Sequence, residues 1–308
     1  MNAPKVTIIT AAYNYGRFIE EALQSVLTQS FQDFEYIIID DGSTDDTPER
    51  MKKYEGRVRY FYHANSGQYQ TFNKAIAMAQ GEYVAFLDAD DTWHPDFLKR
   101  SVQFLDHSEA AMVFCNFSSF DERGIWRTSA FAQIPALRES VIVHEFIMER
   151  CLEHLIMQDF IFPSCSVIRR GVFDQMRFEP VFKGSDYDFF IRMALHYKIG
   201  VMTDVLTNKR DHDHNGSSNL TYNMTDRTGA MQRLLATPQL DPAIVQLAKK
   251  RLAEAYYFLA YDAFKKRNLS YSKICADQSL RAHASFRALK TWAYSHLLSP
   301  FAQRLQSS

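Results

Sequence analysis

The sequence predicts an α/β protein in which helices flank a mostly parallel sheet and a helical appendage follows at the C-terminal side. Three observations support this prediction. Residues 6–87 alternate short apolar runs with segments of helical periodicity. Polar residues, many of them aspartates, directly follow the apolar runs. From about residue 228 onward, alanine, leucine and aromatic residues recur at helical spacing.

The first third of the chain is expected to contribute four strands, at residues 6–10, 35–40, 58–62 and 83–87. Helices are expected between them, at 18–27, 43–51 and 72–79. Ser43 and Asp46 have the spacing of a capping box for the second helix, and Gly81 closes the third. Parallel strands joined by helices end at one edge of a sheet, so the polar residues after each strand should meet there.

Beyond residue 110 the pattern is less regular. Strands are expected at 111–117, 162–168 and 201–209, a hairpin at 118–126, and helices near Val172 and at 186–197. The appendage should form helices at 244–264, 271–282 and 286–305. This pattern predicts an α/β domain of residues 1–225, with halves of about 1–115 and 116–225, followed by a helical region of residues 226–308.

Composition narrows the class of protein. The 308 residues are 46% hydrophobic and 14% aromatic, enough for a sizeable core, and the formal net charge of −1 suggests no nucleic-acid partner. The four cysteines form no CxxC pair, which favours buried thiols in a reducing cytoplasm. With a strand predicted so close to the N-terminus, no signal peptide is expected, and no apolar run approaches the ~18 residues of a membrane span.

The most informative segment is the acidic run Asp88-Ala89-Asp90-Asp91, which directly follows the apolar run at 83–87. Burying ionised carboxylates is costly unless a cation or hydrogen bonds compensate them. The segment therefore predicts a divalent metal ion held for a phosphate-bearing substrate. The alternative is a strand followed by an acidic helix cap, with Asp91 capping the turn that begins near Pro95.

Four segments stand in order across about residues 5–220: Val6-Thr-Ile-Ile-Thr-Ala-Ala-Tyr-Asn14, Ile39-Asp-Asp-Gly-Ser-Thr-Asp45, Gly81-Glu-Tyr-Val-Ala-Phe-Leu-Asp-Ala-Asp-Asp91 and Gly184-Ser-Asp186. In residue type, order and spacing they resemble the motifs of family 2 of the glycosyltransferases, inverting enzymes of the GT-A fold. The resemblance implies a GT-A type, Rossmann-like sheet. Its first half would bind the nucleotide-sugar and its second half the acceptor.

The resemblance implies a nucleotide site made of Ala11, Tyr13, Asp41, Asn73 and Asp88. In this site Tyr13 stacks on the base, and Asp41 accepts a hydrogen bond from the ring N–H of uracil, which favours a uridine nucleotide. Asp88 lies near the ribose or a metal-bound water. The alternatives are a core aromatic for Tyr13 and a helix cap for Asp41. Lys74 reaches a phosphate or is simply solvated on its helix.

The resemblance also implies a metal site, in which Asp90, together with Asp88, holds Mn²⁺ or Mg²⁺ and diphosphate oxygens complete the shell. The metal offsets charge on the departing nucleoside diphosphate. Arg210 and His212 match an Arg-x-His element of the family, so His212 is a further candidate ligand, and His214 a weaker one. The alternative for this loop is a solvated surface turn.

Asp186 matches the catalytic base of the family. Inversion requires the acceptor hydroxyl to attack from the face opposite the leaving group, and a carboxylate there removes its proton. The alternative for Asp186 is a helix N-cap, with Asp188 as the second candidate base. Ser185 stands where many relatives carry an acidic residue, which makes the acceptor side less predictable.

The expected function is therefore metal-dependent, inverting transfer of a sugar from a UDP-sugar to a hydroxyl of a glycan or lipid-linked saccharide, in cell-surface polysaccharide biosynthesis. The alternative is a catalytically inactive nucleotide-sugar-binding or scaffold protein, against which Asp88, Asp90 and Asp186 argue. A dinucleotide-dependent dehydrogenase is excluded, because residues 11–16 lack the GxGxxG fingerprint.

The C-terminal segment carries an aromatic and basic amphipathic pattern. It predicts either peripheral contact with an anionic membrane, at the inner face of the plasma membrane, or core packing or homodimerisation through the same helices. The residues of the pattern are Trp292, Tyr294, Leu297, Leu298 and Phe301, alternating with Arg281, Arg287, Lys290 and Arg304.

Overall fold

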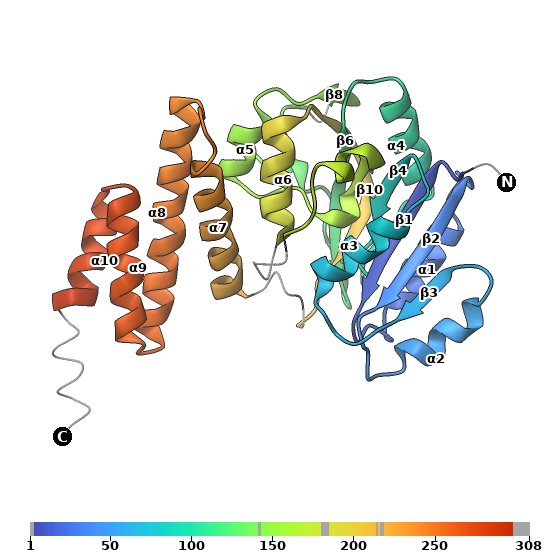
Figure 1. Cartoon of the computed structure of the whole chain (residues 1–308), viewed down its shortest axis with the longest axis horizontal. Coiled ribbons are helices and arrows are strands. Elements are labelled where there is room, and N and C mark those ends of the chain that lie inside the picture. The colour runs from blue at the N-terminus through green and yellow to red at the C-terminus, as the bar shows by residue number, and fades with distance from the viewer. Residues whose placement is uncertain (1–2, 141–142, 180–184, 214, 216–218, 298–308) are drawn as a thin grey trace. The chain divides into compact units, whose positions relative to one another are not determined.

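The computed structural model describes residues 3–140, 143–179, 185–213, 215 and 219–297 (Figure 1). The chain divides into two compact units. The first consists of Met1–Cys151, Phe160–Pro180 and Met193–Asp213, and the second of Leu152–Asp159, Val181–Arg192 and His214–Ser308. The boundary expected at residue 225 falls inside a helix, α7 (Leu220–Leu235).

The first unit is built around one sheet with the strand order β3-β2-β1-β4-β9-β6-β10-β5. The strands β1 to β4 are parallel to one another, β9 runs antiparallel between β4 and β6, and β6 is parallel to β10. The mostly parallel sheet is therefore confirmed. The bounds are β1 Val6–Ala12, β2 Phe34–Asp40, β3 Arg59–Tyr62, β4 Tyr83–Phe86, β5 Thr92–Trp93, β6 Met112–Asp121, β7 Gly124–Arg127, β8 Glu145–Ile147, β9 Ser166–Arg169 and β10 Ile199–Arg210.

The register of the parallel strands brings their polar ends to one edge. Ala12 of β1 lies opposite Asp40 of β2, and Ile9 of β1 lies opposite Phe86 of β4. Tyr13, Asp41 and Asp88 therefore leave the sheet on the same side, as expected for the carboxyl ends of parallel strands. β10 runs in the same direction as β4, so its last residue, Arg210, also ends at this edge.

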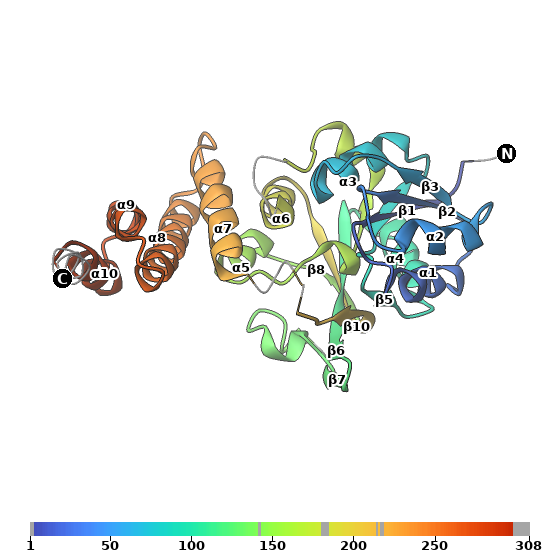
Figure 2. The ribbon, with the colours of Figure 1, turned by 90° about the horizontal axis from the view of Figure 1, so that it is seen from below.

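Helices cover both faces of the sheet: α1 (Ile19–Leu27), α2 (Thr47–Met51), α3 (Gln68–Met78) and α4 (Phe97–Asp106). Figure 2 shows α3 on one side of β1, β2 and β3, and α1 and α4 on the other. Under α3, the rings of Phe72, Phe86 and Phe178 lie with centroids 4.9–5.5 Å apart. This aromatic cluster anchors the helix beside the end of β4.

The second unit is helical. It contains most of α5 (Cys151–Met157), the first part of α6 (Ser185–His196), α7, α8 (Pro242–Lys265), α9 (Leu269–Ala282) and α10 (Phe286–Leu297). Small buried residues such as Ala260 and Ala276 let α8 and α9 approach closely. Asn219, Asp241 and Asn268 cap the N-termini of α7, α8 and α9 through their side chains. The C-terminal helical region is therefore confirmed.

Several expected boundaries were wrong. Ser43 does not cap α2; its hydroxyl accepts the backbone N–H of Asn14 at 2.8 Å. The helix expected at 72–79 begins at Gln68, and the strand expected at 162–168 is limited to β9, after a 3₁₀ turn. The helices α4, α5 and α7 were not expected. The last expected helix extends to residue 305, and its part beyond residue 297 lies outside the described residues.

Candidate active site

The acidic run leaves β4 in a tightly held conformation. The backbone N–H of Leu87 donates to the carbonyl of Ile9 at 3.0 Å, and the backbone N–H of Asp88 donates to the hydroxyl of Ser164 at 3.0 Å. Asp90 and Asp91 are 7% and 2% exposed, while Asp88 is half-buried. Asp90 and Asp91 therefore have little access to bulk water at the edge of the sheet, while Asp88 keeps partial access.

Burial and neighbouring charges raise the pKa values of Asp88 and Asp91. Burial raises the pKa of Asp88 to about 7, with a further rise from the charge of Asp90 and an opposing effect of Lys209. Burial and the charges of Asp90 and Asp88 also hold the pKa of Asp91 well above its usual value. The same three carboxylates add to the effect of burial in raising the pKa of Tyr15. The edge thus carries more negative charge than its surroundings compensate.

The end of β10 is bound to the acidic run. The backbone N–H of Arg210 donates to Asp91 Oδ1 at 2.9 Å, and Arg210 Nε donates to the carbonyl of Asp90 at 2.9 Å. His212 Nε2 lies 2.9 Å from Asp90 Oδ2, and its ring packs against Phe18 with centroids 4.9 Å apart. Asp91 therefore fixes β10 rather than capping the turn near Pro95. The N-cap of α4 is Asp96.

Asp88, Asp90 and His212 offer carboxylate oxygens and an imidazole nitrogen, the donors that suit Mg²⁺ or Mn²⁺. The poorly compensated charge of the acidic run fits a cation in this position. Among the residues that the structure describes, no set of three or more His, Cys, Asp or Glu side chains is arranged to hold a metal ion. Substrate oxygens would therefore have to complete the shell.

A second polar cluster forms around Asp41, after β2. Its Oδ1 accepts the backbone N–H of Ser66 at 2.7 Å, and its Oδ2 accepts that of Gly67 at 2.7 Å. Gly42 has φ +85°, and a Cβ there would lie 2.8 Å from the backbone nitrogen of Asn65. Only glycine fits between these loops, and it lets Asp41 reach the N–H groups. Asp41 is 3% exposed.

Gln68 connects the two clusters, because its Nε2 donates to Asp88 Oδ1 at 3.0 Å while its two preceding residues bind Asp41. Beside the same loop, Lys74 Nζ donates to Ser66 Oγ at 3.0 Å. Lys209 places its Nζ 5.1 Å above the ring of Phe162. Sequence reasoning missed Gln68, Tyr15 and Lys209. Gln68 and Tyr15 match no motif, and only long-range packing brings these side chains to the acidic run.

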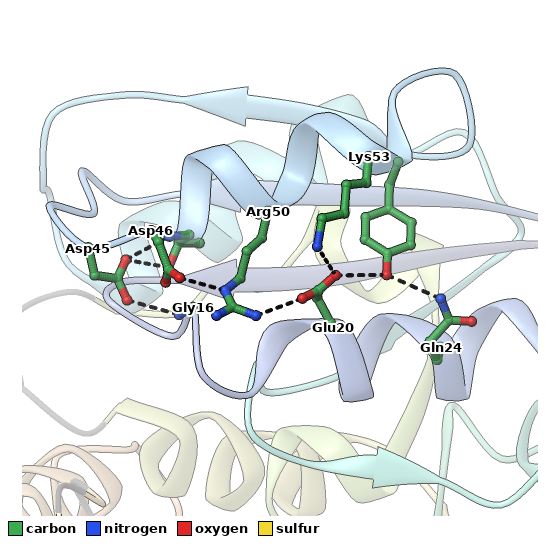
Figure 3. Close-up of polar contacts among 9 residues, drawn as sticks. Gly16, Glu20, Gln24, Asp45, Asp46, Arg50 and Lys53 are labelled. Carbon is green, nitrogen blue, oxygen red and sulfur yellow. Dashed lines mark hydrogen bonds and ion pairs between the residues drawn. The ribbon is translucent and has the colours of Figure 1, made fainter.

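The loop after β1 is held by a network that joins it to the loop after β2 (Figure 3). The backbone N–H of Gly16 donates to Asp45 Oδ2 at 2.9 Å, and Arg50 contacts both Asp46 and Glu20. On the same loop Asn14 adopts φ +60°, and its Oδ1 accepts the N–H of Thr44 at 2.7 Å. These contacts hold the loop that carries Tyr13.

The remaining candidates of the nucleotide site lie in different settings. Tyr13 directly follows β1 and is 46% exposed, so its ring is accessible to a base. Ala11 pairs with Ile39 within the sheet. Asn73, on α3, donates from Nδ2 to the carbonyl of Phe178 at 2.7 Å and accepts the N–H of Phe178 at 3.2 Å. Asn73 therefore clamps a backbone segment, and its place in a donor pocket stays a prediction.

The two candidate bases belong to the second unit, on the first turn of α6. Asp186 is half-buried, and its Oδ1 accepts the N–H of Tyr187 at 2.9 Å. It is inside the helix, which begins at Ser185, and so is not its N-cap. Asp188 is 2% exposed and contacts Arg192 at 2.8 Å and Arg233 at 3.0 Å. Gly184 and His214 lie outside the described residues.

The ion pairs of Asp188 predict a structural role. Asp188→Asn removes the charge that two guanidinium groups contact, and should lower the free energy of unfolding by roughly 2 kcal/mol. This loss is smaller than the loss expected for a fully buried ion pair, because Arg233 is partly exposed. Urea unfolding followed by circular dichroism measures this change. Glu139→Gln, at a side chain 88% exposed, is the control and should change stability by less than about 0.5 kcal/mol. Equal stability of both variants would contradict the structural role.

Residues 7–177, more than half of the chain, match the family model described as Glycosyl transferase family 2. The chain belongs to glycosyl transferase family 2. The resemblance read from the motifs is thereby confirmed, and the protein is a glycosyltransferase by family.

Among similar proteins, the "Putative teichuronic acid biosynthesis glycosyltransferase TuaG" of Bacillus subtilis is 41% identical over 125 residues, which cover 39% of this glycosyltransferase chain and 50% of the relative. The chain spans about half the length of the curated relatives it matches. In fold it is similar to S. aureus TarS 1-349 in complex with UDP-GlcNAc, with TM-score 0.72, 17% identity, and 97% and 92% of the two chains covered. A mannosyltransferase of Pyrobaculum calidifontis in complex with GDP-Man and Mn²⁺ has TM-score 0.58, 18% identity, and coverage of 99% and 84%. These structures confirm the GT-A type of fold.

Within the described part of the chain, no helix is both long and apolar enough to cross a membrane.

Proposed function

We propose that this chain is a metal-dependent, inverting glycosyltransferase that moves a sugar from a UDP-sugar to a hydroxyl of a glycan or lipid-linked saccharide. One observation carries the proposal: Asp88 and Asp90, the latter with His212 Nε2 2.9 Å from its Oδ2, lie at the edge of the sheet where Asp41 and Tyr13 also emerge. Ligands of open α/β sheets bind at such an edge. Family membership supplies the reaction class.

The donor is proposed to be a uridine nucleotide because Asp41 presents an acceptor in the position that the family motif gives to the uracil contact. Its carboxylate already accepts two backbone N–H groups, which fix its orientation before a ligand arrives. The fold neighbour TarS was solved with UDP-GlcNAc and with UDP. Tyr13, with an accessible ring on a held loop, is proposed to stack on the base.

Asp90, Asp88 and His212 are the residues proposed to hold Mg²⁺ or Mn²⁺. When bound, such an ion supplies Lewis-acid stabilisation of the diphosphate leaving group. Arg210 and Asp91 position this site, because their hydrogen bonds join β10 to the acidic run and so place His212 beside Asp90. A mannosyltransferase of the same fold was solved with GDP-Man and Mn²⁺.

Asp186 is proposed to take the proton of the acceptor hydroxyl. Its position in the first turn of α6 favours the ionised carboxylate, because the positive end of the helix dipole lies there. Asp188 fits this task poorly, since it is buried and occupied by two arginines. We propose that residues 1–225 form the catalytic domain, with the donor half at about 1–115 and the acceptor half at about 116–225.

The acceptor and the cellular location are proposed from the name of a similar protein. A similar protein carries a name that refers to teichuronic acid biosynthesis. We therefore propose a role in cell-surface polysaccharide assembly, at the cytoplasmic face of the plasma membrane.

The test is a donor screen. The protein is incubated with Mn²⁺ and each of UDP-glucose, UDP-galactose, UDP-GlcNAc and GDP-mannose, with saccharide acceptors, and released nucleoside diphosphate is measured. Turnover of a UDP-sugar above GDP-mannose is expected. UDP binding without turnover of any donor would instead support the catalytically inactive nucleotide-sugar-binding or scaffold protein.

A substitution of Asp41 tests more specifically which nucleotide base the donor carries. Asp41→Asn should reduce the preference for UDP over CDP by about tenfold, because a carboxylate accepts from N3–H of uracil but repels the N3 lone pair of cytosine. Competition binding of both nucleotides to the wild type and the variant measures this ratio. A loss of affinity that is equal for UDP and CDP would show that Asp41 only supports the loop at residues 66–67.

A further inference from the structure

The charge of the chain is strongly segregated. Residues 263–308 contain eight Lys and Arg residues and one acidic residue, Asp277, although the whole chain has a formal net charge of −1. No acidic residue follows Asp277. The C-terminal helices are therefore basic, while the rest of the chain is acidic, and such asymmetry indicates an anionic partner for the basic part.

The structure separates two faces of α10. Its inner face, formed by Ala288, Thr291 and Ser295, is buried, and Ser295 Oγ lies 2.9 Å from Ser272 Oγ of α9. Trp292 belongs to this inner side, since it packs against the cluster around Leu259 and donates from Nε1 to Asp277 Oδ1 at 2.8 Å. Trp292 is therefore packed in the core, as the alternative to membrane contact expected. Asp277, the one acidic residue of 263–308, accepts its hydrogen bond at the contact between α9 and α10.

The outer face of α10 carries large apolar side chains among cations. Phe286 is 82% exposed, Leu289 53% and Tyr294 48%. Arg287 and Lys290 are exposed beside them, with Lys290 Nζ 5.8 Å from the centroid of the Tyr294 ring. Exposed apolar groups in this density are uncommon on a helix that faces only water.

We propose that this face of α10, defined by Phe286, Arg287, Leu289, Lys290 and Tyr294, docks on an anionic lipid surface. The aromatic and leucine side chains would enter the headgroup region, while the two cations contact lipid phosphates. A second copy of the chain fits this face less well. In a two-fold dimer the same face meets itself, which would bring the cations of both copies together.

Among the helices that the structure describes, α10 is the last along the chain, which makes it a suitable place for such docking. α10 packs on α9 and α8 and follows α7, α8 and α9 in the chain (Figure 1). Phe286, Leu289 and Tyr294 stay exposed while Ala288 and Ser295 are buried. The proposal goes beyond the proposed transfer reaction and does not depend on it, because binding to lipid can be measured without any sugar donor.

The test is co-sedimentation of the full chain with vesicles of phosphatidylcholine alone, or with about one third phosphatidylglycerol. Binding is expected with the anionic vesicles and should fall at about 0.5 M NaCl, where charges are screened. Arg287→Glu/Lys290→Glu should weaken it at least tenfold. Lys249→Glu/Lys250→Glu makes the same charge change at exposed positions on α8 and should keep most of the binding.

The apolar contribution is tested with Phe286→Ser/Leu289→Ser, which alters exposed side chains and should leave folding intact while reducing vesicle binding. Equal binding to neutral and anionic vesicles, or equal loss in both glutamate variants, would overturn the proposal. Light scattering distinguishes the other occupant: a wild-type dimer that Phe286→Ser/Leu289→Ser dissociates, without lipid binding, would assign the face to a second copy.

Discussion

Asp186→Asn is expected to slow sugar transfer by ~10²-fold or more while leaving the affinity for UDP within about twofold of the wild type. The asparagine amide has the same size as the carboxylate and can still accept the hydrogen bond from the N–H of Tyr187. It cannot take a proton from the acceptor hydroxyl. The loss should therefore appear in kcat. Steady-state rates and UDP binding, measured on the same preparation, separate the two effects.

Asp188→Asn is the matched control for this experiment, because it makes the same chemical change two residues along α6. It should reduce stability through its two arginine contacts. Well below its unfolding temperature it should retain most of the turnover. The proposed base would instead be Asp188 if Asp186→Asn kept full activity while Asp188→Asn, under conditions where it is folded, lost turnover by ~10²-fold.

Asp90→Ala is expected to reduce transfer at saturating Mn²⁺ by more than ~10²-fold, since a metal ligand stabilises the leaving group by several kcal/mol. Without metal, the variant should be at least as stable as the wild type, because one of three crowded carboxylates has been removed. Mn²⁺ should raise the melting temperature of the wild type and not that of the variant.

Asp213→Ala, at an exposed carboxylate on the same loop as His212, is the control for Asp90→Ala. It should keep both the rate and the stabilisation by Mn²⁺. If Asp90→Ala retained the metal response, the ion would have to be held without Asp90, and the proposed ligand set would be wrong.

The sheet and its polar edge could be predicted from the sequence because both depend on local patterns. Apolar runs give the strands, and the register of parallel strands then determines where Asp41 and Asp88 emerge. The family could also be recognised, since its motifs are short and ordered. The roles of the site residues remain predictions.

Contacts between distant segments could not be predicted in the same way. Gln68 reads as an ordinary helical residue, and only the packing of α3 brings it to Asp88. Asn73 fits a ligand pocket by its chemistry, yet the structure uses both ends of its amide on Phe178. Helix α7 has few apolar residues at regular spacing, and it buries Asp226 and Thr228, so its amphipathic signal is weak.

The aromatic and basic residues of α10 do not all lie on one side of the helix. Trp292 and Tyr294 belong to one aromatic, basic segment in the sequence. On α10 they lie on different sides, because Trp292 shares the inner side with Ala288 and Ser295. Composition could therefore indicate the chemistry of the segment, whereas the structure was needed to divide it into a packed and an exposed face.

Asp90 and its neighbours are proposed to make nucleotide binding depend on a divalent cation. Calorimetric titration of UDP into the wild-type protein, with and without Mn²⁺, measures this dependence. Mn²⁺ should strengthen UDP binding at least about tenfold, and Asp90→Ala should abolish the difference. Equal binding of UDP with and without Mn²⁺, or no binding in either condition, would contradict it.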